Sequence, residues 1–107
     1  TFHSDGKMDE FTPLLIELGF SSVHGCEKAA NDLDDVVERF GDDICLVGNV
    51  DVVFLSRATP DEVRKETEAM LLSGSRKGRF IAACNTSPQD YIPEDNYRAM
   101  AHVIANF

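Results

Sequence analysis

The chain has 107 residues, of which 43% are hydrophobic and 27% are charged. This length suits one domain with a buried core, and the hydrophobic content excludes intrinsic disorder. Ten basic and 19 acidic residues give a net charge of -9. Such an acidic balance argues against a partner that is nucleic acid or an anionic membrane surface. No apolar run is long enough to form a transmembrane helix.

The three cysteines, Cys26, Cys45 and Cys84, stand far apart and form no CxxC pair. This spacing argues against a disulfide framework and favours a reducing compartment, so we expect a cytoplasmic protein. The chain starts Thr-Phe-His, without an initiator Met and without the pattern of a signal peptide. We therefore expect a piece of a longer protein.

Short apolar segments alternate with helical patterns four times along the chain. The first unit has a strand at residues 2–3, a turn at 4–6 and a helix that ends at Gly19, with apolar positions Phe11, Leu14, Leu15 and Leu18. The second has a strand at 22–24 and a helix that ends at Gly41, with Asn31 as its expected N-cap and apolar positions Leu33, Val36, Val37 and Phe40.

The third unit has the strongest strand pattern, at residues 44–47, followed by a turn at Gly48-Asn49. Its helix opens with Thr59-Pro60-Asp61-Glu62, which predicts a capping box, and buries Val63, Met70 and Leu71. The fourth unit has a basic loop at 75–79, which we interpret as a solvated turn, and a strand at 80–83. Its helix starts near Pro93, with Tyr97, Met100, Ile104 and Phe107 expected to be buried.

Strict alternation of strands and helices predicts an α/β fold with a parallel sheet and right-handed crossovers. Four such units fit either a doubly wound sheet or half of a (β/α)8 barrel. Neither GxGxxG nor a P-loop is present, which weakens the nucleotide-binding interpretation. A half barrel would need its other half or a second copy of the chain, because both sheet edges would otherwise stay unpaired.

Polar residues cluster where the predicted strands end, and chemistry in parallel α/β folds sits at those ends. The spacing His3-x-Asp5 on an extended segment puts both side chains on one face. Together with the Cys84 thiolate they could form a three-ligand zinc site with one open position. The alternative is that His3 and Asp5 only bond to each other and that Cys84 is a small buried residue.

The other strand-end residues supply candidates for proton transfer and substrate contact. We take Asp5, Asn49 and Asp51 as candidate catalytic residues, and Glu27 and Asn85 as candidate substrate-binding residues. Asp5 and Asp51 are also common turn formers, so their positions do not require a function.

Several stretches, in order and over essentially the whole chain, resemble the C-terminal half of the uroporphyrinogen decarboxylase superfamily. They are Phe2-His3-Ser4-Asp5-Gly6, Glu17-Leu18-Gly19-Phe20, Phe40-Gly41-Asp42, Gly48-Asn49-Val50-Asp51, residues 58–63 and residues 93–100. The resemblance implies that residues 1–107 form the last four units of a (β/α)8 TIM barrel. It also implies that the isolated chain is inactive, because a site at the barrel mouth needs loops from both halves.

The superfamily resemblance implies one of two activities for the full-length protein. One branch decarboxylates uroporphyrinogen, a tetrapyrrole, without a cofactor, and it carries a Gly-His-Gly-type turn after the last strand and an Asp-Trp pair. This chain has Cys84-Asn85-Thr86 at that turn and no Trp at all. The other branch transfers methyl groups between corrinoids and thiols or similar acceptors, using zinc held by a His-x-Cys pair and a later Cys.

His3 and Cys84 match that zinc pattern, while Asp5 stands in place of the first Cys. The first hypothesis is therefore zinc-dependent methyl transfer from a corrinoid, with His3, Asp5 and Cys84 as ligands. The alternative is a decarboxylase that acts on a tetrapyrrole and needs no metal.

Overall fold

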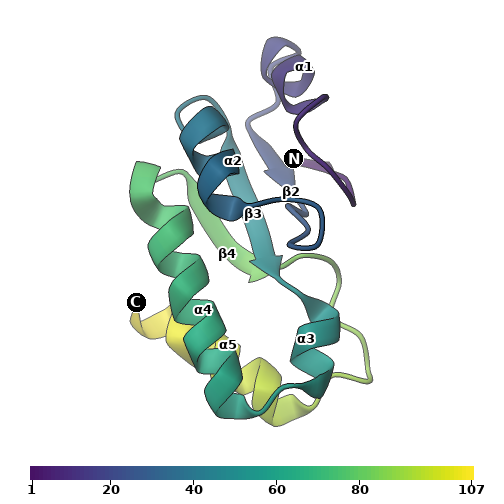
Figure 1. Ribbon diagram of the computed structural model, residues 1–107, viewed down its shortest axis with the longest axis vertical. Coiled ribbons are helices and arrows are strands. Elements are labelled where there is room, and N and C mark those ends of the chain that lie inside the picture. The colour runs from purple at the N-terminus through teal and green to yellow at the C-terminus, as the bar shows by residue number, and fades with distance from the viewer.

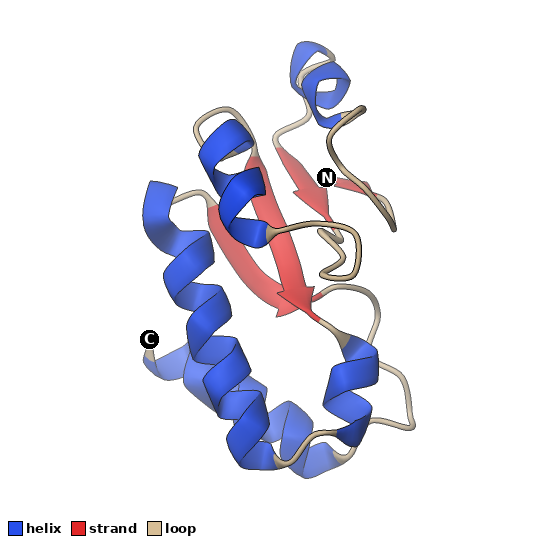
Figure 2. Ribbon diagram, in the orientation of Figure 1, coloured by secondary structure: helices blue, strands red, loops and turns tan.

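The computed structural model describes residues 1–107, which form one parallel sheet with helices between the strands (Figures 1 and 2). The strands are β1 (Phe2–His3), β2 (Ser22–His24), β3 (Cys45–Val50) and β4 (Phe80–Cys84), and they neighbour one another in sequence order. All three neighbouring pairs are parallel. The predicted α/β fold with a parallel sheet is therefore confirmed.

Five α-helices connect or follow these strands. They are α1 (Thr12–Glu17), α2 (Leu33–Phe40), α3 (Val52–Arg57), α4 (Pro60–Gly74) and α5 (Glu94–Asn106), with a short 3-10 turn, η1 (Ser75–Lys77), after α4. In Figure 1, α2 and α4 lie in front of the sheet, on the same face. None of the helices is both long and apolar enough to cross a lipid bilayer.

Local capping signals set where the two best-predicted helices begin. Thr59 and Glu62 form the predicted capping box at the start of α4, with each side chain bonded to the other's backbone N–H. Helix α2 is capped by Asp32, whose side chain accepts from the Asp35 N–H, and not by Asn31 as predicted. Asn31 instead bonds to loop backbone, so its side chain is not available for the cap.

The third unit departs from the prediction at the end of its strand. β3 continues through Gly48-Asn49 to Val50, where a turn was expected, and α3 then follows at once. Asp51 caps α3 by accepting from the Phe54 N–H at 2.8 Å. The four apolar residues from Val52 to Leu55 show no helical period, which is why this helix was not predicted.

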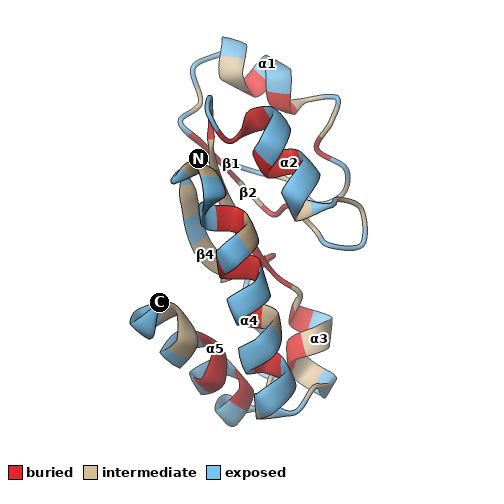
Figure 3. Cartoon of the chain, turned by 60° about the vertical axis from the view of Figure 1, so that its left-hand side comes forward, coloured by how far each residue is buried: buried red, intermediate tan, exposed pale blue.

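Two apolar clusters lie between the sheet and the helices (Figure 3). One is built around Val23, Val37 and Leu46, and the other around Leu55, Val63 and Met100. The expected burial of Tyr97 and Phe107 is wrong, since both are exposed, and the apolar positions Leu14 and Leu18 of the first helix are exposed as well. In α1 the packed face carries Thr12 and Leu15, and in α5 it carries Asn96, Ala99 and Met100.

The opposite face of the sheet is only partly covered, and β3 and β4 place apolar side chains on it. Ile81 is 55% exposed although it lies within β4. It pairs with Val47 of β3, which is half-buried. Apolar side chains on an uncovered face of a parallel sheet are what the interior of a (β/α)8 barrel consists of, so the arrangement matches part of such a barrel.

Close backbone approach at the ends of β1, β2 and β3 requires glycine at two positions. Gly25 has φ +126°, and a Cβ there would lie 2.2 Å from the Ser4 carbonyl oxygen. Gly48 has φ +147°, and its Cβ would lie 2.8 Å from the Gly25 carbonyl oxygen. Both contacts are with backbone, which cannot move aside without breaking the strand ladder.

We predict that Gly25→Ala destabilises the protein by about 3 kcal/mol or more, because it adds a backbone clash to an unfavourable φ. Gly19→Ala is the matched control, since Gly19 has φ +82° with nothing within 4 Å of the added Cβ. Its cost should be about 1 kcal/mol. Denaturant unfolding of the full-length variants measures both, and an equal cost at the two positions would contradict the close approach.

Candidate functional site

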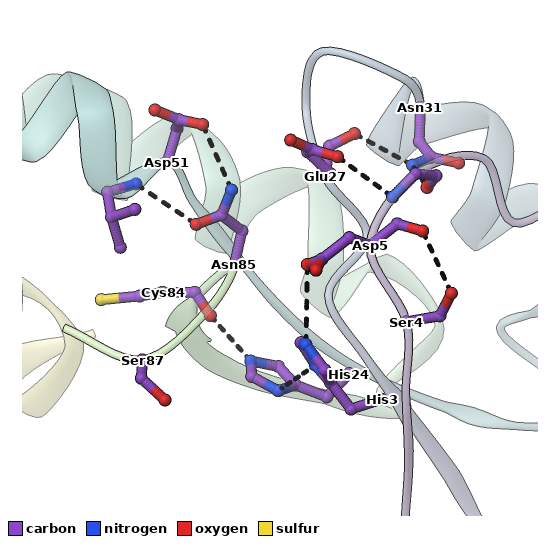
Figure 4. A network of polar contacts seen from close by, with 12 residues as sticks. His3, Ser4, Asp5, His24, Glu27, Asn31, Asp51, Cys84, Asn85 and Ser87 are labelled. Carbon is purple, nitrogen blue, oxygen red and sulfur yellow. Dashed lines mark hydrogen bonds and ion pairs between the residues drawn. The ribbon is translucent and has the colours of Figure 1, made fainter.

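The candidate site lies where β1 and β2 end, around two histidines. His3 and His24 are direct neighbours in the parallel register of these strands, so their side chains project from the same face. Their rings lie 4.7 Å apart between centroids, and the two Nδ1 atoms are 3.0 Å apart. On the far side of the pair, His24 Nε2 lies 2.9 Å from the Cys84 carbonyl oxygen of β4. Figure 4 shows this chain of contacts.

Asp5 lies beside His3 on the solvent-exposed side of the histidine pair. Its Oδ1 lies 3.5 Å from His3 Nε2, as expected for two residues spaced His-x-Asp on an extended segment. The side chain of Asp5 is 75% exposed and that of His3 is 44% exposed. A ligand approaching the strand ends would therefore meet the Nε2 edge of His3 and the carboxylate of Asp5.

The Cys84 thiol, which the sequence analysis gives as the third expected ligand, does not lie with this group in the structure. Cys84 pairs with Val50 of β3, and both side chains belong to the buried cluster beneath α5. The sulfur lies 3.8 Å from Met100 Sδ, and burial raises the pKa of the thiol. The side chain therefore lies on the helix-facing side of the sheet, and only the Cys84 carbonyl reaches the histidine pair.

No set of three His, Cys, Asp or Glu side chains lies close enough together to hold a metal ion. His3 and Asp5 provide two such groups, and the third expected ligand lies on the other face of the sheet. The residues as arranged do not fit the three-ligand zinc site.

Three of the predicted site residues stabilise the backbone around α3 and β3. Asn85 is buried, accepts from the Val52 N–H and donates to Asp51, while Asp51 also caps α3. Asn49 is buried as well and donates to the Cys26 carbonyl oxygen at 3.0 Å. The structure thus brings Asp51 and Asn85 together in capping contacts, while the Asn49 side chain bonds to the Cys26 carbonyl instead.

Asn49 also lines a cavity of about 420 Å³ between α2 and α4, together with Lys28, Asp32, Glu66 and Met70. This cavity does not include the histidine pair.

Glu27 ties the loop after β2 to the loop after β1. Its Oε2 accepts from the Gly6 N–H at 3.0 Å, and Asn31 bonds to Gly6 and Met8 beside it. These contacts hold Asp5 and the neighbouring strand end in place. A carboxylate that already accepts a backbone bond has less capacity left for a substrate.

Comparison with known proteins identifies the family to which this chain belongs. A family model described as uroporphyrinogen decarboxylase (URO-D) matches residues 1–107. The chain belongs to the uroporphyrinogen decarboxylase family. The resemblance drawn from the sequence motifs is thereby confirmed, together with the barrel-type fold. A search of curated proteins gives no match.

Among solved structures, a methyltransferase from Methanosarcina mazei is similar, with a TM-score of 0.74 and 23% sequence identity. The match covers 98% of this chain and 30% of that one. At this identity the likeness shows the fold, and the chain spans less than a third of that structure.

For this member of the uroporphyrinogen decarboxylase family, the sequence motifs pointed to His3 and Asp5 but not to His24. His24 belongs to one of the polar clusters at the predicted strand ends, as His3 does, but no motif gives it a role. Two consecutive strands of a parallel sheet place such end residues side by side. The strand at 22–24 is short and weakly apolar, so its register could not be fixed from the sequence.

Cys26, next to this site, gives a direct test of the described burial. Burial, with a smaller contribution from the charge of Asp32, raises the pKa of its thiol from an ordinary 9.0 to about 12. At pH 8 this rise in pKa lowers the thiolate fraction of Cys26 by about a thousandfold. Alkylation slows accordingly, because only the thiolate reacts. We predict that iodoacetamide alkylates Cys26 at least that much more slowly in the folded protein than in urea.

Mass spectrometry of the labelled peptides measures the rate, with half-buried Cys45 as the internal comparison. Equal rates for Cys26 in folded and unfolded protein would contradict its burial.

Proposed function

We propose that the full-length protein transfers a methyl group between a corrinoid and a thiol or similar acceptor, at the strand ends where His3 and Asp5 meet. The observation that carries the proposal is the exposed Nε2 edge of His3 beside the Asp5 carboxylate, 3.5 Å away. Membership of the family and the likeness to a methyltransferase support the same reaction class. The sequence also lacks the Trp and the last-strand His of the decarboxylase pattern.

Zinc, when bound in such a site, would act as a Lewis acid that turns an acceptor thiol into a thiolate. The present residues do not fit that role, because the Cys84 sulfur packs against Met100 and leaves only His3 and Asp5. No step of the proposed reaction is therefore assigned to a metal.

The proposed step uses His3 as a general base. The neutral imidazole accepts the proton of the acceptor thiol at Nε2, and the sulfur electron pair attacks the methyl carbon. The carbon–cobalt bond breaks and its electron pair stays on the cobalt of the corrinoid substrate. Asp5 lies next to the positive charge that His3 acquires and stabilises it.

Decarboxylation of uroporphyrinogen is the second candidate. The observation that favours it is a histidine pair without a third metal ligand at the strand ends. Loss of CO2 requires a proton on the carbon that is left behind, and an imidazolium at His3 could supply it. The chain's departures from the decarboxylase motifs make this candidate the weaker one.

We predict that His3→Gln lowers methyl transfer by about 10²- to 10⁴-fold in the full-length protein, the usual range for loss of a general base. Asp5→Asn should cost about tenfold, because it removes only the stabilising charge. The assay supplies methylcobalamin and a small alkyl thiol, and it follows demethylation of the corrinoid by absorbance. His102→Gln, on the exposed side of α5, is the matched control and should leave the rate unchanged.

Full activity in His3→Gln would overturn the proposed base. Absence of methyl transfer in the wild type, with CO2 release from uroporphyrinogen, would instead establish the second candidate.

The metal content gives a separate prediction. We expect the zinc content of the full-length protein to be the same in the wild type and in Cys84→Ser, because the thiol does not face the site. Elemental analysis after dialysis measures it. About one zinc per chain that is lost in Cys84→Ser would show that the thiol turns into the site and that the zinc-dependent mechanism holds.

A further inference from the structure

We infer that His24 is a positioning residue that fixes the ring protons of His3, so that His3 presents a lone pair at Nε2. The inference deepens the proposed function only in its kinetic consequence, since the arrangement of ring protons is a property of the protein without substrate. In one contact of the histidine pair the donor and the acceptor are fixed by chemistry.

That contact joins His24 Nε2 to the Cys84 carbonyl oxygen at 2.9 Å. A carbonyl oxygen only accepts, so His24 Nε2 must carry the hydrogen. A neutral His24 then has its lone pair on Nδ1. The backbone of β4, which is tied to β3 by ladder hydrogen bonds, therefore sets the tautomer of a side chain on β2.

The contact between the two Nδ1 atoms then fixes the tautomer of His3. The two Nδ1 atoms lie 3.0 Å apart, and two lone pairs would repel each other at that distance. His3 Nδ1 must therefore donate to His24 Nδ1, which leaves the lone pair of neutral His3 on Nε2. This tautomer is the minor one for a free neutral imidazole in water, so it needs the partner that His24 supplies.

The consequence appears at the exposed end of the chain of contacts (Figure 4). His3 Nε2, an acceptor, faces Asp5 Oδ1, another acceptor, at 3.5 Å. Two hydrogen-bond acceptors this close favour a donor within reach of both, such as the S–H or O–H of the substrate that receives the methyl group. His24, which does not reach the exposed edge, acts through the orientation and tautomer of His3.

The test measures the ring nitrogen-15 shifts of the histidines in full-length protein labelled with ¹⁵N-histidine, at a pH where the rings are neutral. We expect His24 in the Nε2–H form and His3 in the Nδ1–H form. His24→Phe keeps a flat ring but removes both nitrogens, and His3 should then revert to the Nε2–H form. His24→Asn can still place an amide oxygen near His3 Nδ1 and should restore part of the Nδ1–H form.

A wild-type His3 in the Nε2–H form, or an Nδ1–H form that persists in His24→Phe, would overturn the inference. His102→Phe is the control and should leave the His3 signals unchanged. The wild-type measurement decides the question even where a variant fails to fold, and it does not depend on turnover.

The kinetic consequence is tested in the methylcobalamin assay. We expect His24→Phe to lower kcat about tenfold or more with little change in KM, and His24→Asn to recover part of the loss. If the tautomers are as inferred but no methyl transfer occurs, the proposed function fails and the positioning role of His24 stands. If kcat is unchanged while His3 reverts, the tautomer assignment stands and its kinetic consequence is overturned.

Discussion

The parallel register between β1 and β2 is the constraint on which the site depends. A single offset of 21 residues pairs Phe2 with Val23 and His3 with His24, and it continues past the strands to the bond between Gly6 and Glu27. This pairing places two imidazoles in contact and holds the following loop, with Asp5, beside them. A shift of this register by one residue would move His24 to the other face of the sheet and separate the two imidazoles.

Most polar side chains at the strand ends stabilise the backbone. Asn85, Asp51 and Asn49 satisfy buried N–H and carbonyl groups, and Glu27 anchors the loop after β1. Such contacts offset the desolvation of these polar side chains, because each hydrogen bond lost to water is replaced by one within the protein. His3 and Asp5 differ in keeping exposed acceptor atoms, and for this reason the proposed chemistry is assigned to them.

Features decided by a few neighbouring residues could be predicted from the sequence. The alternation of strands and helices and the capping box at Thr59 and Glu62 are of this kind. Family motifs added the barrel-type fold and pointed to His3. The buried faces of α1 and α5 could not be predicted, because they depend on which helix and strand lie alongside.

The orientation of Cys84 depends on the same kind of non-local information. Strand alternation changes face at every residue, so a boundary uncertain by one position leaves the direction of the thiol undecided. Its register partner, Val50, decides it in the structure. His24 stayed unrecognised for a related reason, since its importance comes from a partner on β1 and a carbonyl on β4.

The most direct test of the account is a crystal structure of the full-length protein with methylcobalamin bound, with anomalous data collected to identify any metal. The account predicts that the corrinoid lies at the strand ends with its methyl group on the side of His3 Nε2, while the Cys84 sulfur remains against Met100. A zinc ion bound by His3, Asp5 and Cys84, or a corrinoid bound away from these residues, would contradict it.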